Sequence, residues 1–362
     1  MRITTRKTVF GGLAALGVAA LLAGCAQAPT SGESSGSAAP VASDFLPCMV
    51  SDAGGFNDNS FNQIGLAGLT DAAKKLGVKE IHVESSSDSD YTPNITNLLD
   101  QGCNLIVTVG FNLAAATKEA ATANPKVNFA IIDDNSIDLP NVKPIVFDTA
   151  QAAFLGGYAA ASYSKTGVVG TFGGLPIPPV TIFMDGFADG VKYFNDQKSK
   201  DVKVLGWDVA SQNGVFTGGF DAGTVAKQTA QGQIDQNADV ILPVGGPIYK
   251  SAAEAVRDAN KGIVLIGVDA DLTQTDTANA DLFLTSILKG IQPGVEETTT
   301  AAAEGKFDNS PFVGTLKNEG VALAPFHDFE SKVDPALQGE LDTIKAGIID
   351  GSIPVESPSS PK

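Results

Sequence analysis

Residues 52–63 read DAGGFNDNSFNQ and directly follow the apolar run FLPCMVS at 45–51. Gly54 and Gly55 permit backbone angles closed to other residues, so the chain can turn sharply out of a strand. Residues 57–60 are all Asn, Asp or Ser and are candidate N-caps for a helix predicted over 61–76. This composition is typical of a strand-to-helix turn, and its acid, amides and aromatic rings equally fit a ligand-binding loop. Local composition does not choose between the two interpretations.

The alternation of a short apolar run with a helical pattern continues along the chain. It predicts parallel sheets built from strand–helix units. Ten strands exceed the usual size of one sheet, so we expect two sheets. The predicted strands are 45–51, 80–84, 104–109, 127–132, 144–147, 167–172, 202–207, 239–244, 263–268 and 282–288. The predicted helices are 61–76, 93–101, 113–123, 150–164, 180–195, 222–231, 248–260, 295–304 and 335–346.

Two lobes are expected, because the alternation restarts near Asp148 with a new helix and strand. We predict an α/β protein in which two doubly wound parallel-sheet lobes enclose an interlobe cleft. In open α/β sheets, ligands bind beyond the carboxyl ends of the strands, and polar or glycine residues recur there in this chain. These strand-end residues are Asp52, Gly110, Asp133, Gly173, Gly174, Asp208, Gly245, Gly246 and Asp269. They should converge on one cleft.

The N-terminus has the features of a bacterial lipoprotein leader. Arg2, Arg6 and Lys7 precede an apolar stretch over 9–23, and the residues at 22–25, LAGC, resemble a lipobox. We expect removal of residues 1–24 as a signal peptide and lipid attachment at Cys25. The lipid would anchor the protein to the extracytoplasmic face of the cell membrane. No later run approaches the roughly 18 apolar residues needed to cross a bilayer.

Domain boundaries follow from the same patterns. Residues 25–44 are rich in Ala, Ser, Gly and Pro and are expected to be a flexible tether. Residues 45–148 form the first lobe, with a returning segment from about residue 270. Residues 149–268 form the second lobe, together with part of the C-terminal region to about residue 354. Residues 355–362 are expected to be a disordered tail.

Charge and residue usage exclude several classes of ligand. The formal net charge is −17, and it becomes −20 without the leader, which holds three basic residues and no acid. Nucleic acid is therefore not an expected partner, since phosphate binding needs a basic face. Arg257 is the one arginine beyond the leader, whereas sites for carboxylates and phosphates commonly use arginine. This scarcity argues against amino acids and nucleotides as ligands.

The remaining cysteines, Cys48 and Cys103, both lie in apolar runs. We interpret them as two buried thiols, although an exported protein also permits a disulfide between them.

The sequence offers little catalytic or metal-binding chemistry. The two histidines, His82 and His327, stand in no metal-ligand spacing, no phosphate-loop motif occurs, and no GxSxG motif occurs after residue 44. Asp269 and Asp271 form a D-x-D, but the first ends a strand and the second lies in a loop, so we expect no metal site. No enzyme activity, catalytic residue or cofactor is expected.

Hydrogen-bonding acids remain as candidate ligand contacts. Asp52 and Asp133 can accept hydrogen bonds from N–H or hydroxyl groups, and Asp269 can accept from two sugar hydroxyls at once. Lys289 can donate to an oxygen of the same sugar and neutralise Asp269. Taken singly, each of these residues also fits an ordinary strand end.

Two aromatic residues complete the candidate site. Phe61 and Phe220 offer flat faces on which a base or ring can stack, a contact worth roughly 1–3 kcal/mol per base. Either ring, considered alone, fits a packed core as well.

Seven motifs occur along the chain in a fixed order: 52–76, 102–111 (GCNLIVTVGF), 131–133 (IID), 151–160 (QAAFLGGYAA), 186–191 (GFADGV), 267–271 (GVDAD) and 285–289 (TSILK). As an ordered set they resemble the basic membrane protein (BMP) family of substrate-binding lipoproteins, whose best-understood branch is the purine nucleoside receptor A type. The resemblance covers essentially the whole chain after the leader.

The resemblance implies a periplasmic-binding-protein type I fold and the capture of a nucleoside for an ABC importer. It implies that Asp52 contacts the base and that Phe61 stacks on it. Asp133, or its neighbour Asp134, is implied as a further base contact.

The resemblance also implies a second stacking aromatic from the other lobe, placed at Phe220. The loop at 173–179, GGLPIPP, departs from the family pattern, so Phe216 and Phe183 stay open as alternatives. The residues implied at the sugar are Asp269, Lys289, Asn62 and Gly245.

We therefore expect a lipid-anchored, monomeric receptor that binds a nucleoside, with a purine favoured, and presents it to an ABC permease. Two alternatives stay open. One is a receptor for a free sugar or other small polar ligand, and the other is a ligand sensor coupled to a membrane kinase.

Overall fold

The computed structural model describes residues 44–361. The predicted signal peptide and the lipidation site at Cys25 lie outside the described residues, as does the predicted tether apart from its last residue. Among residues 44–361, no helix combines the length and the apolar composition needed to span a membrane.

The first sheet, sheet A, is parallel throughout. Across the sheet its strands are β13 (Phe312–Gly314), β5 (Val142–Phe147), β4 (Asn128–Ile132), β3 (Leu105–Val109), β1 (Pro47–Val50) and β2 (Ile81–Val83). The helices packed on it are α1 (Phe61–Leu76), α2 (Tyr91–Asp100), α3 (Ala114–Ala123) and α9 (Ile291–Ala303).

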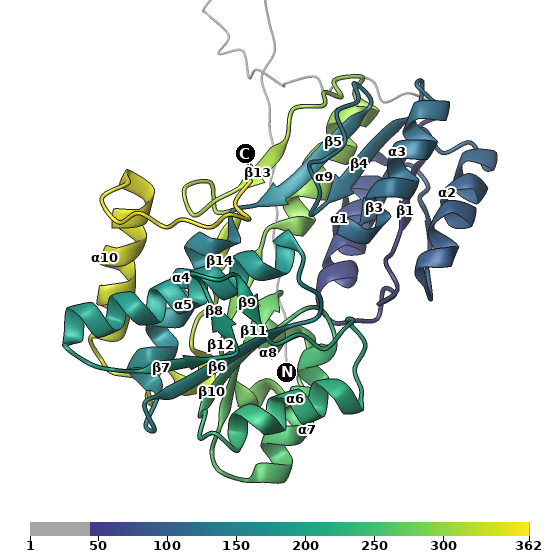
Figure 1. The fold of residues 1–362 in the computed structure, drawn as a ribbon. Helices are drawn as coiled ribbons and strands as arrows, with labels where there is room; N and C mark the ends of the chain where they lie inside the picture. The colour runs from purple at the N-terminus through teal and green to yellow at the C-terminus, as the bar shows by residue number, and fades with distance from the viewer. Residues whose placement is uncertain (1–43, 362) are drawn as a thin grey trace, which may run out of the picture. The chain divides into compact units, whose positions relative to one another are not determined.

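Successive residues of sheet A face two different helix layers. Met49 of β1 packs in the same core as Leu69 of α1, whereas its neighbour Cys48 packs with Ile95 and Leu98 of α2. Figure 1 shows α1 and α9 on one side of the sheet and α2 and α3 on the other. Strands buried on both faces explain why the strand sequences are continuous apolar runs rather than alternating ones.

The second sheet, sheet B, is parallel except for its edge strand β14, which is antiparallel to β12. Its strands in order are β14 (Val321–Leu323), β12 (Phe283–Lys289), β11 (Val264–Asp269), β10 (Val240–Val244), β6 (Val168–Gly173) and β7 (Lys203–Leu205). Its long helices are α4 (Thr149–Tyr163), α5 (Pro178–Lys198), α6 (Thr224–Ile234) and α7 (Ile248–Ala259), and α10 (Leu337–Asp350) packs on α4.

Sheet B repeats the two-sided burial. Leu242 of β10 packs in the core that contains Phe187 of α5, and its neighbour Ile241 packs in the core that contains Ala226 of α6 and Ala252 of α7. The predicted α/β class with two doubly wound parallel sheets is therefore confirmed.

The chain passes between the two sheets three times. It crosses after β5 at Asp148, after β12 at Gly290, and between β13 and β14. Backbone hydrogen bonds tie these crossings together, from Asp148 N to Gly314 O (2.8 Å) and from Gly290 N to Gly320 O (2.8 Å). The segment that returns to sheet A therefore begins with α9 rather than near residue 270, because β11 and β12 both add to sheet B.

Helices α4 and α5 pack unusually closely because glycines face their neighbours' backbone. A Cβ atom on Gly157 would lie 2.0 Å from the Phe187 carbonyl oxygen, and one on Gly190 would lie 2.0 Å from the Phe154 carbonyl oxygen. The apolar, glycine-rich sequence of α4 thus allows this helix to be buried on almost every side and to pack closely on α5.

This packing predicts opposite effects of the same substitution at two helical glycines. Gly157→Ala should destabilise the protein by about 1–3 kcal/mol, because α4 and α5 must separate. Gly339→Ala in α10 should stabilise it by up to about 1 kcal/mol, since nothing lies within 4 Å of the added methyl and alanine favours helix. Urea unfolding of both variants measures the difference; a destabilised Gly339→Ala with an unaffected Gly157→Ala would contradict this packing.

Several element boundaries differ from the predicted ones. The predicted strand at 202–207 is divided into β7 and a short β8 (Trp207–Asp208), because Gly206 adopts a φ of 86°. β8 pairs with β9 (Asn213–Gly214), and the short strands β9, β13 and β14 were not predicted. Runs of two or three residues carry too little periodicity to show as strands.

The interpretation of Cys48 and Cys103 as free thiols is wrong. The two residues form a disulfide, with their Cα atoms 6.0 Å apart. β1 and β3 are neighbours, with Cys48 opposite Ile106, so the residues just before β3 come within reach of Cys48. This proximity depends on the strand order, which residue spacing does not reveal.

The expectation of a disordered tail after residue 354 is also wrong. Residues 355–361 lie against the body of the protein, and three of their serine hydroxyls bond to side chains of α5 and of the first crossing. A composition of Ser and Pro hides this, because these contacts are polar and need no apolar run.

Candidate ligand-binding site

A cavity lies where the carboxyl ends of the strands of both sheets meet. Sheet A contributes residues that follow β1, β3 and β4, and sheet B contributes residues at the ends of β10, β11 and β12. The lining residues are Asp52, Phe61, Gly110, Phe111, Asn112, Asp133, Ile177, Pro179, Val180, Phe183, Phe220, Val244, Gly245, Gly246, Val268, Asp269 and Lys289. Six of the nine predicted strand-end residues are thus brought together, as the rule for parallel sheets requires.

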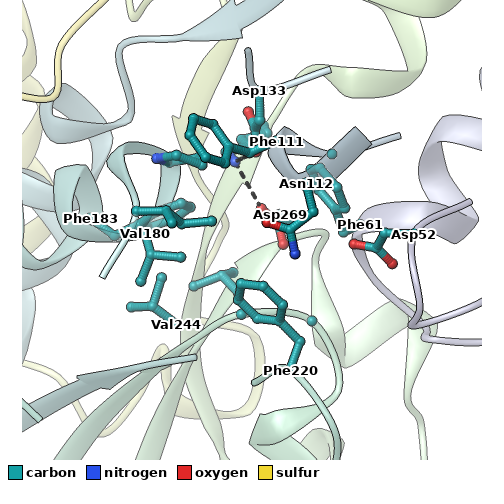
Figure 2. A pocket seen from close by; sticks show the side chains of 17 residues that line it. Asp52, Phe61, Phe111, Asn112, Asp133, Val180, Phe183, Phe220, Val244 and Asp269 are labelled. Atoms are coloured by element: carbon teal, nitrogen blue, oxygen red, sulfur yellow. Dashed lines mark hydrogen bonds and ion pairs between the residues drawn. The ribbon is translucent and has the colours of Figure 1, made fainter. Parts of the chain in front are cut away.

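Figure 2 shows the arrangement of the labelled side chains. Asp52 lies beside Phe61, Phe220 lies at another edge of the cavity, and Val180 and Phe183 line a third side. Asp208 does not belong to the site, because β8 turns away into a hairpin and leaves its side chain exposed.

The loop at 52–63 is both a helix cap and a wall of the cavity. Asp58 is buried and accepts hydrogen bonds from the backbone N–H groups of Ser60 (3.0 Å), Asn62 (2.8 Å) and Gln63 (3.1 Å). These are donors that the first turn of a helix leaves unpaired. Asp58 therefore holds the start of α1, which places Phe61 in the cavity.

Asp52 is held in place by the same loop. The Asn62 side-chain amide donates to Asp52 Oδ1 (2.7 Å), and its oxygen accepts from the Asp52 N–H (3.1 Å). Gly54 N donates to the same Oδ1 (2.8 Å). Burial raises the pKa of Asp52 to about 6, and these hydrogen bonds only partly oppose that rise.

An acid–lysine cluster occupies the part of the cavity nearest the crossings. Lys289 Nζ lies 2.6 Å from Asp133 Oδ2 and 3.6 Å from Asp269 Oδ1. Lys289 is 6% exposed and Asp269 5% exposed, so water screens this cluster little. Both acids adopt left-handed backbone, with φ of 66° at Asp133 and 68° at Asp269. Strained backbone of this kind is common where side chains must point into a ligand site.

The charges in the cluster depend on one another. Burial alone disfavours a charged Lys289, but Asp133 and Asp269 outweigh burial and raise its pKa. Burial raises the pKa of Asp269 to about 6, with Lys289 opposing the rise and Asp133 adding to it. Burial also raises the pKa of Asp133 against the effect of Lys289. One ammonium group therefore neutralises part of the charge of two carboxylates, and the Asp269 carboxylate can still accept hydrogen bonds from a ligand.

Aromatic rings surround the lysine. Lys289 Nζ lies 5.1 Å from the ring centre of Phe183, 5.3 Å from that of Phe61 and 5.8 Å from that of Phe147. At these distances the ring faces attract a cation, which helps to keep an ammonium group at a site with little water.

Phe220 rests on two glycines. A Cβ atom on Gly174 would lie 2.3 Å from the Phe220 ring, and one on Gly245 would lie 2.6 Å from it. Gly245 also has a φ of 138°, which other residues rarely adopt. Phe183 lines the cavity as well, whereas Phe216 packs edge-on against Trp207 and does not line it.

Most of the candidate ligand-binding residues predicted from the sequence line this cavity, and Asn62 is the exception. Asn62 is buried and does not line the cavity; its amide orients Asp52 instead. Asp134 lines an adjoining cavity rather than this one. Phe111 and Asn112 were missed, although they directly follow the strand-end residue Gly110 that marked this position.

No group of His, Cys, Asp and Glu that could hold a metal ion is found within residues 44–361. The side chain of Asp271, the second acid of the D-x-D, accepts from Thr273 N and Thr273 Oγ1 and pairs with His327 Nε2 at 2.8 Å.

Two sheets joined by three crossings, with a polar and aromatic cavity at the carboxyl ends of their parallel strands, define a two-lobed protein of the periplasmic-binding-protein type I fold. The chain belongs to the Bmp family, described as ABC transporter substrate-binding protein PnrA-like, whose model matches residues 45–352.

Individual relatives agree with this assignment. The chain is 32% identical, over 95% of its length and 97% of the relative's, to "ABC transporter nucleoside-binding protein BmpA" of Lactococcus lactis subsp. cremoris. It is 29% identical, over 84% of its length and 86% of the relative's, to "Basic membrane protein A" of Borreliella burgdorferi. The names of these two relatives describe binding and membrane proteins and no enzyme.

Solved structures share the fold at lower identity. An ABC transporter solute-binding protein from Aeropyrum pernix K1 matches with a TM-score of 0.77 and 24% identity, over 87% of this chain and 94% of that one. AraP, an arabinose-binding protein from Geobacillus stearothermophilus, matches with a TM-score of 0.58 and 15% identity, over 80% of this chain and 99% of that one.

Proposed function

We propose that the protein binds a nucleoside, with a purine nucleoside favoured, and delivers it to an ABC permease. The observation that carries this proposal is the presence of two chemically different groups in one cavity. Asp52 and a buried acid–lysine cluster both line it, and the ring of Phe61 lies beside Asp52 with its centre 5.3 Å from Lys289 Nζ. The name of the Lactococcus relative, a nucleoside-binding protein, supports the same ligand class.

In the proposed complex the base lies between Phe61 and Phe220, with Asp52 accepting from an N–H of the base. The sugar lies at the acid–lysine cluster, where two hydroxyls donate to Asp269 and Lys289 donates to a sugar oxygen. Asp133 was expected at the base. Because it pairs with Lys289 at 2.6 Å, we propose that it positions the lysine at the sugar.

The site draws its parts from both sheets. Asp52 and Phe61 follow strand β1 of sheet A, whereas Phe220, Asp269 and Lys289 belong to the sheet B side. Ser60 Oγ donates to Val268 O (3.1 Å) and to Asp269 Oδ2 (3.3 Å), so the first loop touches the sugar end directly. A ligand that bridges both sides would favour the closed arrangement of the lobes, which the permease then recognises.

Titration calorimetry with inosine, adenosine, cytidine and ribose tests the ligand class. We expect nucleosides to bind and ribose to bind at least about 100-fold more weakly, because ribose forgoes stacking on both sides of the base. Equal affinity for ribose and the nucleosides would favour the free-sugar alternative. Absence of any nucleoside binding would refute the proposal.

The anchor is a separate part of the proposal. We propose that lipid on Cys25 holds the protein at the extracytoplasmic face of the membrane. Replacing Cys25 with serine should release the protein from the membrane fraction. Retention of the Cys25→Ser variant in that fraction would contradict the proposed anchor.

Stacking predicts a selective effect of Phe61→Ala. Affinity for nucleosides should fall by about 1–3 kcal/mol, because one face of the base loses its partner. Phe216→Ala is the matched control, since Phe216 does not line the cavity. Calorimetry on both variants measures this, and an equal loss in both would count against stacking on Phe61.

The raised pKa values predict that ligand affinity falls on acidification. Asp52 and Asp269, each with a pKa of about 6, must be ionised to accept from the ligand, so affinity at about pH 5 should be clearly weaker than at about pH 7.5. The free energy of unfolding of the ligand-free protein should show the opposite trend, because protonation of these two acids favours the folded state. An acid whose folded pKa is raised favours folding when protonated, and this contribution is lost as pH rises through about 6. Calorimetry at both pH values measures the affinity, and unfolding without ligand measures the stability. An affinity that does not change with pH would contradict the claim that Asp52 and Asp269 bind the ligand as ionised acceptors.

A further inference from the structure

The C-terminal strap, residues 355–361, lies beyond the part of the chain that the family model matches. Its serine hydroxyls make three contacts with the body of the protein. Ser357 Oγ donates to Asp185 Oδ2 (2.6 Å), Ser359 Oγ bonds Thr181 Oγ1 (2.8 Å), and Ser360 Oγ donates to Asp148 Oδ1 (2.8 Å). The strap thus runs from α5 to the first crossing between the sheets.

The α5 end of the strap is fixed to a buried carboxylate. Asp185 is 0% exposed and also accepts from Trp207 Nε1 (2.9 Å) and Gln212 Nε2 (2.7 Å). Ser357 completes the set of donors around it. A buried carboxylate deprived of a donor is costly, so the protein gains from holding the strap in place.

The other end of the strap reaches the crossings. Asp148, which accepts from Ser360, also accepts from Gln151 Nε2 (2.7 Å) through its second oxygen. The Gln151 side-chain oxygen in turn accepts from the N–H of Leu316 (3.0 Å), in the third crossing. The strap is therefore connected to two of the segments that must bend when the lobes move.

Between these anchors the strap forms a wall of a second cavity. Ser359, Ser360 and Pro361 line it together with Asp134 and Asn135, which follow β4 of sheet A. This cavity shares four lining residues with the ligand cavity, namely Phe111, Asp133, Pro179 and Lys289. It therefore begins at the acid–lysine cluster, where the proposed function puts the sugar.

We propose that the strap is the end wall of the ligand site and a determinant of its specificity. A substituent extending from the sugar past Asp133 and Lys289 would enter the second cavity and meet the strap. The strap thereby limits the length of ligand at the sugar end, and the carboxylate of Asp134, beside the paired Asp133 and Lys289, disfavours an anionic extension there. The identity of the ligand in this inference rests on the proposed function. The placement of the strap is independent of that function.

Two full-length variants and one shortened chain test the inference. Ser357→Ala combined with Ser360→Ala removes two anchors, a chain ending at Pro354 removes the strap, and Ser352→Ala is a control at a neighbouring serine outside the strap. The first measurement needs no ligand: backbone hydrogen exchange over residues 146–151 and 178–186. We expect exchange to become at least about tenfold faster in the double variant and the shortened chain and unchanged in Ser352→Ala.

The second measurement compares the affinity for a nucleoside with that for the same nucleoside carrying an uncharged alkyl group on its 5′ oxygen. The wild type should prefer the unmodified nucleoside, and this preference should shrink at least about tenfold in the double variant and the shortened chain. Unchanged exchange overturns the inference whatever the protein binds. Faster exchange with an unchanged preference overturns it too. If the wild type binds no nucleoside, the proposed function fails instead, and the exchange result alone decides whether the strap closes this end of the site.

Discussion

Replacing Asp269 with alanine is expected to weaken nucleoside binding by at least about 100-fold. Two sugar hydroxyls would lose a buried, ionised acceptor, and each such hydrogen bond is worth about 1.5–3 kcal/mol. The fold should persist, because Lys289 keeps Asp133 at 2.6 Å. Calorimetry gives the affinity, and thermal unfolding with and without nucleoside shows whether ligand still stabilises the protein.

Asp208→Ala is the matched control for this loss. Asp208 also ends a strand of the second lobe, but it is exposed and outside the cavity. The Asp208→Ala variant should bind nucleoside as the wild type does. Unchanged affinity of the Asp269→Ala variant would contradict the proposal that the sugar binds at Asp269.

Lys289→Met is expected to destabilise the ligand-free protein strongly, by about 3–5 kcal/mol at neutral pH. The substitution leaves two buried carboxylates, Asp133 and Asp269, without their cation, and breaking a buried ion pair on one side costs about this much. The loss should be smaller at about pH 5. Without the lysine the pKa values of both acids rise further, so both are protonated in the folded state and the penalty appears only as pH rises.

Urea unfolding at about pH 5 and pH 8 measures this effect. Adding Asp133→Asn to Lys289→Met should recover part of the stability at the higher pH, because it removes one of the two unpaired charges. Lys192→Met removes an exposed lysine paired with Asp196 and should change little. The same loss at both pH values would show that Lys289 acts through packing rather than through its charge.

The sequence was sufficient for the class of fold because its signals are local. Each strand–helix unit carries an apolar run, a turn and a helix, as residues 45–76 illustrate, and the restart near Asp148 marks the first crossing. The strand-end residues could likewise be combined into one cavity, because parallel strands present their carboxyl ends at one edge.

Features that depend on long-range neighbours were not predictable in this way. The Cys48–Cys103 disulfide depends on the pairing of β1 with β3, and the strap depends on a buried acid in α5. Lys289 was paired from the sequence with Asp269 alone, and Asp133 was missed, for a similar reason: Asp269 is near in sequence, but Asp133, at the end of β4 in the other sheet, makes the shorter contact.

A crystal structure of the protein with a bound purine nucleoside tests the central claim most directly. The proposal predicts the base between the rings of Phe61 and Phe220, with sugar hydroxyls within hydrogen-bond distance of the Asp269 carboxylate and of Lys289. A nucleoside bound in the reverse orientation, with its sugar at Asp52 and its base at the acid–lysine cluster, would contradict it.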